Sequence, residues 1–359
     1  MADSKQAPLD AAAAAKAAFA SVQDKPFPDD IFTAPELRWA VIGCGVIANQ
    51  MAQSLALAGR KLAGVANRTL SKAQAFAEQY GIEKVYESVE DLYADPGIDA
   101  VYITTPHNTH ITYLRDALAA GKHVLCEKAI TLNSAELDEA RAIADEHNVV
   151  LMDATTVLHM PLYQELRRRM DAGDFGRMNL AQLNFGSYKE YGDLTNRFYN
   201  RNLAGGAMLD IGVYALSVMR LFMASQPIEV VSLGNTCETG VDVAGGIVCR
   251  NAEQQLGVVS LTLHSKQPKR SIISFDKCYI EVNEYPRADH ATIVWTADGH
   301  REEVHAGTEA YALCYEMADL EKAVAGDDSK RELLGYASDV MELMTKLRAD
   351  WGVVYPEEE

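Results

Sequence analysis

Residues 38–52 read RWAVIGCGVIANQMA, and this stretch decides the fold of the N-terminal part of the chain. The apolar run Trp39–Ile42 predicts a buried strand. Gly43 and Gly45 predict a tight turn, and the apolar residues that follow have the spacing of a helix. The stretch is therefore expected to form a strand, a tight turn and a helix.

The same turn has the spacing of a dinucleotide-binding motif. In such a motif Gly43 permits the turn, Gly45 lets the backbone approach a pyrophosphate, and the small Ala48 lets the helix pack closely on the strand. The phosphates would lie at the start of the helix, against the free N–H groups near Val46 and Ile47. A glycine-rich turn can also serve packing alone, so the prediction depends on its surroundings.

The surroundings alternate strand and helix from Leu37 to Met152. The expected strands are Trp39–Ile42, Leu62–Val65, Val85–Tyr86, Ala100–Thr104, His123–Cys126 and Val149–Met152. The expected helices include Ser71–Tyr80, Thr109–Ala120 and Asn133–Glu146. Each strand is a continuous apolar run, which indicates a parallel sheet covered by helices on both faces. Residues 37–155 are therefore predicted to form a doubly wound, Rossmann-type α/β domain that binds a dinucleotide.

Residues 156–359 are predicted to form an α+β domain with a large, mostly antiparallel open sheet, for substrate binding and oligomerisation. The expected strands are Met178–Phe185, Glu229–Thr236, Val243–Arg250, Leu256–His264, Arg270–Phe275, Tyr279–Val282 and Thr292–Thr296. The expected helices are Tyr163–Asp171, Gly206–Ala224, Tyr311–Ala325 and Lys330–Asp350. Apolar and polar residues alternate along Val258–His264, so one face of the sheet lies in the core. The other face is either solvated or packed on another subunit.

Residues 1–36 are predicted to form an N-terminal arm. Leu9–Val22 has high helix propensity, and the prolines between residues 24 and 35 make a non-helical connector. The arm is either a frayed tail or a segment that lies over the cofactor or a partner subunit.

Charge and length exclude several classes of partner. The formal net charge of −18 argues against nucleic acid, because phosphate backbones are bound by clustered Lys and Arg. The one dense basic run, Arg167–Arg169, is explained by a solvated helix face. No apolar run approaches the roughly eighteen residues of a membrane span, so no membrane partner is expected.

Cysteine and histidine spacing predicts neither a metal site nor a disulfide framework. The six cysteines show no CxxC spacing. His107 and His110 lie close together in the chain, but no carboxylate or cysteine nearby completes a set of ligands. The cysteines are expected to be reduced core residues of a cytoplasmic protein.

The residues after the second strand bear on the choice of dinucleotide. An acidic residue about twenty positions beyond the glycine turn would bind the 2′-hydroxyl of NAD, and this chain has Asn67, Arg68 and Thr69 there instead. Arg68 can pair with a 2′-phosphate, and the other two can donate hydrogen bonds to it. The loop favours NADP and leaves NAD possible, although an ordinary polar loop is the alternative.

The residues after the fourth and the fifth strand lie at the same predicted edge of the sheet, where ligands of open α/β sheets bind. Thr105, Pro106, His107 and Asn108 follow the fourth strand, and Pro106 would stiffen a loop beneath the nicotinamide half of the cofactor. His107 and its neighbour His110 are more simply explained as residues that begin a helix.

Glu127 and Lys128 follow the fifth strand, where a lysine is costly to bury unless it is paired or used. Asp210 and Tyr214 are four residues apart and would share one face of a helix. An ammonium beside Tyr214 would favour its phenolate, so Lys128 and Tyr214 would make an acid–base pair for a carbinol. A snorkelling surface lysine is the alternative for Lys128.

Together these motifs resemble the glucose–fructose oxidoreductase, inositol dehydrogenase and rhizopine catabolism (Gfo/Idh/MocA) family, over about residues 37–359. The branch that it resembles most includes dihydrodiol dehydrogenase and NADP-dependent D-xylose dehydrogenase. The motifs are Gly43-x-Gly45-x-x-Ala48, Thr105-Pro106, Gly121–Lys128, Gly205-Gly206-Ala207-x-Leu209–Tyr214, Arg68-x-Leu70-Ser71, Glu238–Asp242 and Gly352–Pro356.

The resemblance implies roles for several residues. Lys128 would be the catalytic lysine, Tyr214 the proton donor or acceptor, Asp210 a supporting residue, and Arg68 the selector of the 2′-phosphate. It also implies a Rossmann domain followed by a domain whose open sheet commonly forms dimer contacts, so a homodimer or higher homo-oligomer is expected.

Two departures from the family pattern affect the predicted activity. Ala129 replaces the proline that usually follows the lysine, which predicts tuning rather than loss of activity. Thr156 and Leu158 stand where dihydrodiol-type members carry a tryptophan and an arginine near the substrate, which favours a sugar-like substrate over an aromatic diol. Tyr188, Lys189 and Tyr191 line either the substrate side or the sheet packing.

The sequence thus predicts an oxidoreductase that transfers a hydride between NADP(H) and a secondary alcohol or carbonyl of a sugar-like substrate. A cofactor-binding regulator without turnover and a trans-dihydrodiol dehydrogenase are the alternatives.

Overall fold

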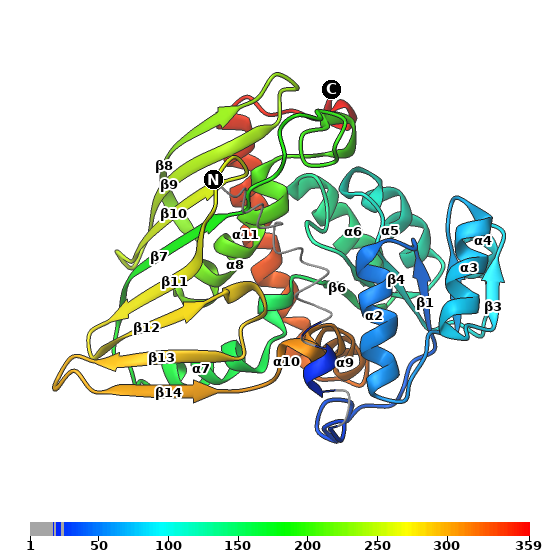
Figure 1. The fold of residues 1–359 in the computed structure, drawn as a ribbon, viewed down its shortest axis with the longest axis horizontal. Helices are drawn as coiled ribbons and strands as arrows, with labels where there is room; N and C mark the ends of the chain where they lie inside the picture. The colour runs from blue at the N-terminus through cyan, green and yellow to red at the C-terminus, as the bar shows by residue number, and fades with distance from the viewer. Residues whose placement is uncertain (1–16, 18, 23–24) are drawn as a thin grey trace, which may run out of the picture.

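The structure is a computed structural model that describes residues 17, 19–22 and 25–359. Two sheets face each other across a layer of helices (Figure 1). Sheet A lies in the N-terminal half and sheet B in the C-terminal half. Helices α8 (Val213–Phe222) and α11 (Leu333–Asp350) lie between them. This arrangement confirms the predicted fold class.

Sheet A has six parallel strands in the order β3-β2-β1-β4-β5-β6, the order of a doubly wound dinucleotide-binding domain. Its strands are β1 (Trp39–Ile42), β2 (Gly64–Ala66), β3 (Lys84–Tyr86), β4 (Ala100–Ile103), β5 (His123–Cys126) and β6 (Leu151–Asp153). Its helices are α2 (Val46–Leu57), α3 (Leu70–Tyr80), α4 (Val89–Ala94), α5 (His110–Ala119) and α6 (Ser134–Glu146). Helix α4 was not predicted because six residues are too short for a helical period to show.

Sheet B has eight strands in the order β14-β13-β12-β11-β7-β10-β9-β8, and every neighbouring pair is antiparallel except β7 and β10. The strands are β7 (Met178–Gly186), β8 (Pro227–Thr236), β9 (Asp242–Asn251), β10 (Leu256–Thr262), β11 (Gln267–Phe275), β12 (Cys278–Asn283), β13 (His290–Trp295) and β14 (Arg301–His305). Strand β14 was not predicted. Among the described strands it pairs with β13 alone, and it carries exposed charged residues, as edge strands do, so its apolar signal is weak.

Five helices accompany sheet B in the chain: α7 (Pro161–Asp171), α8 (Val213–Phe222), α9 (Ala312–Val324), α10 (Asp328–Arg331) and α11 (Leu333–Asp350). Helix α9 packs against α2 and β5 of sheet A, so the C-terminal half closes one face of the N-terminal sheet. The single helix expected over Lys330–Asp350 is two, α10 and α11, which meet at Glu332.

The helix expected over Gly206–Ala224 is not uniform. Met208–Gly212 forms a π-helical turn (η4), and α8 begins at Val213. Among the described residues, Arg201–Phe222 is long and apolar enough to cross a membrane, but 78% of its most apolar window is buried inside the protein. Burial identifies it as a core element beneath sheet B.

The predicted arm is described in part. Most of the expected helix Leu9–Val22 lies outside the described residues, although residues 19–22 are helical. Val22 and Ile31 are buried, and the Phe27 ring lies 5.0 Å from that of Tyr311. The connector therefore packs on its own chain, next to the start of α9.

Candidate active site

The carboxyl ends of four strands meet at one edge of sheet A. The Gly43 N–H donates to the Ala66 carbonyl (2.9 Å), and the Thr104 N–H donates to the Ile42 carbonyl (2.9 Å). The Glu127 N–H donates to the Ile103 carbonyl (3.0 Å). These bonds bring the glycine turn, the loops after β2 and β4, and the segment after β5 to the same edge.

The glycine turn has room and donors for an anion. Gly43 has a φ of +103°, and a Cβ there would lie 2.6 Å from the Thr104 hydroxyl oxygen, so the turn requires glycine. A Cβ on Gly45 would meet no atom of the described residues within 4 Å, so their packing does not require this glycine. Among the same residues no side chain caps the start of α2, and Ala48 is fully buried against the strand. The turn therefore fits a dinucleotide pyrophosphate.

The loop after β2 presents one free cation. The Asn67 side-chain amide donates to the Thr69 carbonyl (3.0 Å), which holds the loop. The Arg68 side chain is exposed and forms no ion pair within the part of the chain that the structure describes. Its guanidinium is available to a phosphate at this end of the site.

The loop after β4 is held by His110. The two ring nitrogens of His110 lie 2.8 Å from the Thr105 carbonyl and 3.0 Å from the Ala129 carbonyl, and the ring is fully buried. Thr109 donates to the Thr105 hydroxyl (2.8 Å). His110 therefore supports both the loop at Pro106 and the segment after Lys128.

His107 and Asn108 connect this loop to the second half of the chain. His107 Nδ1 lies 3.4 Å from the Ala204 carbonyl. Burial, followed by the neighbouring His110 and the cation of Lys128, lowers the His107 pKa to about 3. His107 is thus neutral at physiological pH. The Asn108 side chain donates to the Asn202 carbonyl (3.2 Å) and to a Glu357 carboxylate oxygen (2.7 Å).

Lys128, Asp210 and Tyr214 converge across the two halves. Lys128 Nζ donates to the main-chain carbonyl of Asp210 (2.7 Å) and lies 3.3 Å from its carboxylate Oδ1. The same ammonium lies 4.8 Å from the centre of the Tyr214 ring. The structure thus brings together the three residues predicted to be catalytic, with the ammonium over the ring rather than hydrogen-bonded to the phenol.

Burial and charge set the protonation states of these three groups. Burial raises the pKa of Tyr214 and outweighs the opposing effect of Lys128, so the phenol is protonated at neutral pH. Burial lowers the pKa of Lys128, but the charges of Tyr214 and Asp210 raise it. The net result is a pKa above the ordinary value for lysine, so the amine is charged. Burial would raise the pKa of Asp210, yet Lys128 and Arg197 bring it down to about 2.

Glu127, which follows β5 at the same edge, has a buried partner within the protein. Its carboxylate accepts a hydrogen bond from the buried Tyr102 hydroxyl, and burial raises its pKa. The nearby Glu316 is fully buried, and both of its carboxylate oxygens lack a hydrogen-bond partner among the described residues. Burial, followed by the charge of Glu127, raises the pKa of Glu316 well above its ordinary value.

The π-helical turn that carries Asp210 is anchored by buried contacts. A carboxylate oxygen of Asp242 accepts from the Met208 N–H (2.6 Å), and burial raises the Asp242 pKa to about 6. A Cβ on Gly206 would lie 2.4 Å from the other oxygen of Asp242. The Tyr355 hydroxyl donates to the Gly205 carbonyl (2.6 Å). The chain terminus therefore helps to position the turn.

Arg197 is a site residue that the sequence analysis missed. Its guanidinium lies 3.3 Å from Asp210 Oδ1, the oxygen that Lys128 also approaches. Arg197 belongs to no motif and lies in the irregular segment between β7 and η3 (Arg201–Leu203), so only the folded chain reveals its place.

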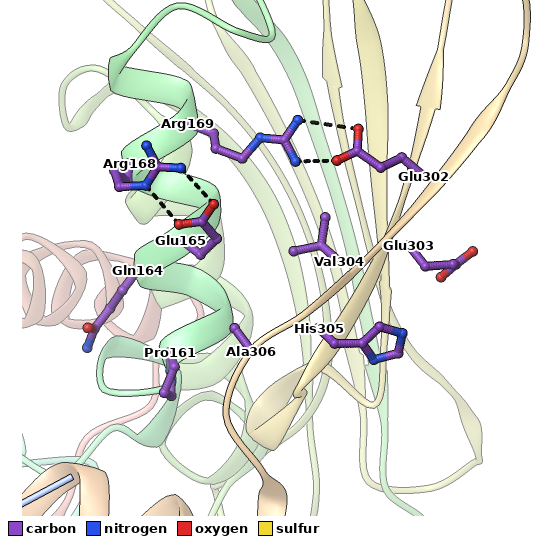
Figure 2. Close-up of a pocket in the computed structure, with 10 residues that line it drawn as sticks. All are labelled: Pro161, Gln164, Glu165, Arg168, Arg169, Glu302, Glu303, Val304, His305 and Ala306. Carbon is purple, nitrogen blue, oxygen red and sulfur yellow. Dashed lines mark hydrogen bonds and ion pairs between the residues drawn. The ribbon is translucent and has the colours of Figure 1, made fainter. Parts of the chain in front are cut away.

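A separate groove lies between α7 and β14 (Figure 2). Its charged residues are largely paired, since Arg169 binds Glu302 (2.6 Å) and Arg168 binds Glu165 (2.8 Å). The groove contains none of the predicted site residues. Within the described ranges, no group of three His, Cys, Asp or Glu side chains could hold a metal ion, and the expectation of no metal stays a prediction.

Comparisons with known proteins agree with this architecture. Residues 37–155 match the model of an oxidoreductase family with an NAD-binding Rossmann fold, and residues 163–281 match the GFO/IDH/MocA C-terminal domain. The chain belongs to the Gfo/Idh/MocA oxidoreductase family. The predicted family is thereby confirmed, and the chain is an enzyme with a nicotinamide dinucleotide-binding domain.

Relatives of this Gfo/Idh/MocA oxidoreductase include dihydrodiol dehydrogenases. The trans-1,2-dihydrobenzene-1,2-diol dehydrogenase of Mus musculus is 32% identical over 254 residues, which are 69% of this chain and 75% of the mouse protein. The Sus scrofa enzyme of the same name is 28% identical over 340 residues, 90% of this chain and 99% of its own.

Solved structures show the same fold. KijD10, a 3-ketoreductase from Actinomadura kijaniata in complex with NADP and TDP-benzene, aligns with a TM-score of 0.75 at 24% identity, covering 88% of this chain and 98% of its own. Levoglucosan dehydrogenase in complex with NADH and levoglucosan aligns with a TM-score of 0.76 at 19% identity, covering 87% and 97%.

Proposed function

We propose that this oxidoreductase interconverts a secondary alcohol and a carbonyl of a sugar-like substrate, with NADP(H) as the preferred cofactor. The observation that carries the proposal is the Lys128 ammonium, held by Asp210 and placed over the Tyr214 ring at the edge that bears the glycine turn. A bound nicotinamide would supply the hydride acceptor or donor.

The acid–base roles follow from the protonation states. In the reducing direction Tyr214, protonated at neutral pH, donates its proton to the oxygen of the carbonyl substrate. In the oxidising direction the Lys128 cation stabilises the phenolate that must form to take the hydroxyl proton, because an adjacent positive charge lowers a phenol's pKa. Asp210 is a positioning residue, since it fixes the ammonium by two contacts.

Arg68 supports the preference for NADP. It is an exposed cation of the loop after β2, with no ion-pair partner among the described residues, at a place where an acidic residue would favour NAD. A 2′-phosphate would accept charge-assisted hydrogen bonds from its guanidinium.

A sugar-like substrate is favoured over an aromatic diol by the residues at positions 156 and 158. Thr156 and Leu158 are both 2% exposed and form a short 3-10 turn (η2). They provide neither the aromatic surface nor the cation of the dihydrodiol-type pattern. The names of the relatives leave a trans-dihydrodiol dehydrogenase as the second candidate.

We also propose that the uncovered face of sheet B joins two copies of the chain. Figure 1 shows the helices of the described residues on one side of this sheet and none of them on the other. Val231, Val248 and Val258 form a continuous row across three strands on the uncovered face. Val231 is 75% exposed and Leu233 is 83% exposed, which is unfavourable in water unless a partner covers them.

We propose a cytoplasmic location, which suits the six free cysteines.

The test of catalysis is the Lys128→Met variant. Purified protein is assayed with aldoses, polyols, keto-sugars and a trans-dihydrodiol, with both cofactors, at the nicotinamide absorbance band. We expect kcat to fall by about 100-fold or more, because the charge that stabilises the phenolate is lost. The matched control is Lys346→Met, an exposed lysine paired with Asp350. Unchanged turnover by Lys128→Met would refute the mechanism, and cofactor binding without turnover of any substrate would favour the regulator.

A further inference from the structure

Two cations lie against one aromatic ring beside the candidate active site. Lys189 Nζ lies 4.1 Å and Arg197 Cζ 4.5 Å from the centre of the Phe198 ring. The backbone of Lys189 is fixed, because its N–H donates to the Leu263 carbonyl (2.8 Å) and its carbonyl accepts from the Tyr199 hydroxyl (3.0 Å). These two bonds fix the backbone of Lys189 next to Leu263, and the Phe198 ring contacts its ammonium.

The positive charge at this place is only partly compensated. Asp210 Oδ1 is shared by Lys128 and Arg197, each 3.3 Å away. The Lys189 ammonium forms neither an ion pair nor a hydrogen bond with any residue that the structure describes. A further cation, Lys269, is already paired with Glu284 at 2.8 Å. Two cations thus share one carboxylate oxygen of Asp210, and the charge of Lys189 acts on the same carboxylate from nearby.

The surroundings of Lys189 penalise its charge. Burial lowers the Lys189 pKa, the charge of Asp210 opposes this, and the charges of Arg197 and Lys128 lower the pKa further. Contact with the Phe198 ring offsets only part of this cost, because an aromatic face attracts a cation less strongly than a carboxylate or phosphate does. A half-buried lysine without an anionic partner is unfavourable unless a ligand supplies the anion.

We propose that the substrate carries an anionic group, a carboxylate or a phosphate, which binds to Lys189 together with Arg197. The inference rests on the proposed function, because it specifies the substrate of the site formed by Lys128 and Tyr214. Carboxylates and phosphates are the groups that lysine and arginine bind through charge-assisted hydrogen bonds. Sugar acids and sugar phosphates are therefore preferred over neutral sugars and apolar diols.

The kinetic experiment compares matched substrates at saturating NADP⁺. Glucuronate, glucose 6-phosphate and glucose distinguish a carboxylate, a phosphate and a neutral sugar of the same ring. We expect kcat/KM for one of the two anionic sugars to exceed that for glucose by about tenfold or more. Lys189→Met should lower this value by about 10–100-fold and bring the ratio of kcat/KM for the anionic sugar to that for glucose close to one. Lys346→Met should change neither.

A binding experiment separates this proposal from the proposed function. The thermal midpoint of unfolding is measured for the NADP⁺-saturated protein with added inorganic phosphate or malonate, neither of which can be oxidised to a carbonyl. We expect at least one anion to raise the midpoint of the unsubstituted protein and of Lys346→Met, but not of Lys189→Met.

The possible outcomes are distinguishable. Anion binding that depends on Lys189, without turnover of any substrate, would support the anion site and refute the proposed catalysis. Turnover of neutral sugars with equal or better efficiency, unaffected by Lys189→Met, would support catalysis and overturn the anion site. Equal stabilisation of Lys189→Met by phosphate and malonate would also overturn it.

Discussion

Lys128, just after β5, donates a hydrogen bond of 2.7 Å to the main-chain carbonyl of Asp210, 82 residues later in the chain. This bond joins the edge of sheet A to the π-helical turn that precedes α8. The two halves of the protein therefore meet at the group proposed to assist catalysis. Changes on either side of this contact should alter the acid–base chemistry.

Asp210→Asn should shift the pH dependence of substrate oxidation. Burial raises the Tyr214 pKa and Lys128 lowers it, while the Asp210 carboxylate raises it. Because Asp210 has a pKa of about 2, it is negatively charged throughout the neutral range, and its removal should lower the Tyr214 pKa. We expect the pH at which oxidation becomes fast to fall by about 1 unit, measured from kcat against pH.

The control for this shift is Asp350→Asn, an exposed carboxylate paired with Lys346. Its pH profile should match that of the unsubstituted enzyme. A profile of Asp210→Asn that keeps the original midpoint would contradict the electrostatic role given to this carboxylate.

Arg68→Ala should weaken NADP binding and leave NAD binding nearly unchanged. A charge-assisted hydrogen bond to phosphate contributes about 1.5–3 kcal/mol, so the dissociation constant for NADP should rise by about 10–100-fold. Fluorescence titration with both cofactors measures the change. Equal affinities for the two cofactors before substitution, or a preference for NAD that Arg68→Ala does not alter, would refute the assignment.

Arg348→Met should destabilise the protein strongly. The Arg348 side chain is 2% exposed, binds a Glu358 carboxylate oxygen at 2.7 Å and also donates to the Leu132 carbonyl (2.5 Å). Removing one partner of a buried ion pair costs about 3–5 kcal/mol, because the remaining charge stays buried. Urea unfolding measures this loss, and Arg301→Met, at an exposed arginine of β14, is the control.

The contribution of this ion pair should depend on pH in a defined direction. Burial would raise the Glu358 pKa, but the hydrogen bonds from Arg348 and Asn133 bring it below its ordinary value of 4.5. The stabilisation is therefore complete above pH 4.5 and is lost as the pH falls through the lowered pKa of the folded state. The difference in unfolding free energy between Arg348→Met and the unsubstituted protein should shrink on acidification, and a constant difference would contradict this account.

Leu233→Glu should abolish self-association through sheet B. Leu233 is 83% exposed on β8, and a buried, unpaired carboxylate at an interface is strongly unfavourable. Light scattering coupled to gel filtration should show the mass of a dimer or larger oligomer falling to that of a monomer. The control, Ala119→Glu at the exposed end of α5, should keep the original mass. A monomeric unsubstituted protein would show that the uncovered face is solvated.

Much of the fold could be predicted from local patterns. Trp39–Ile42 and His123–Cys126 are strands over the predicted residues, because a continuous apolar run between turn residues marks a buried parallel strand. The helix expected over Asn133–Glu146 is α6, which Asn133 caps by accepting from the Glu136 N–H (3.0 Å). Features without an apolar period, such as β14 and the division at Glu332, could not be predicted in this way.

The sequence by itself determined the Rossmann turn, the family, and the residue types gathered at the sheet edge, because these depend on short spacings along the chain. Only the tertiary structure decided which partners those residues have. It placed Lys128 on the Asp210 carbonyl and over the Tyr214 ring, and it directed Glu127 to Tyr102. It also brought Lys189 and Arg197 to one ring. Such contacts depend on how distant strands and loops pack, and no local periodicity encodes that packing.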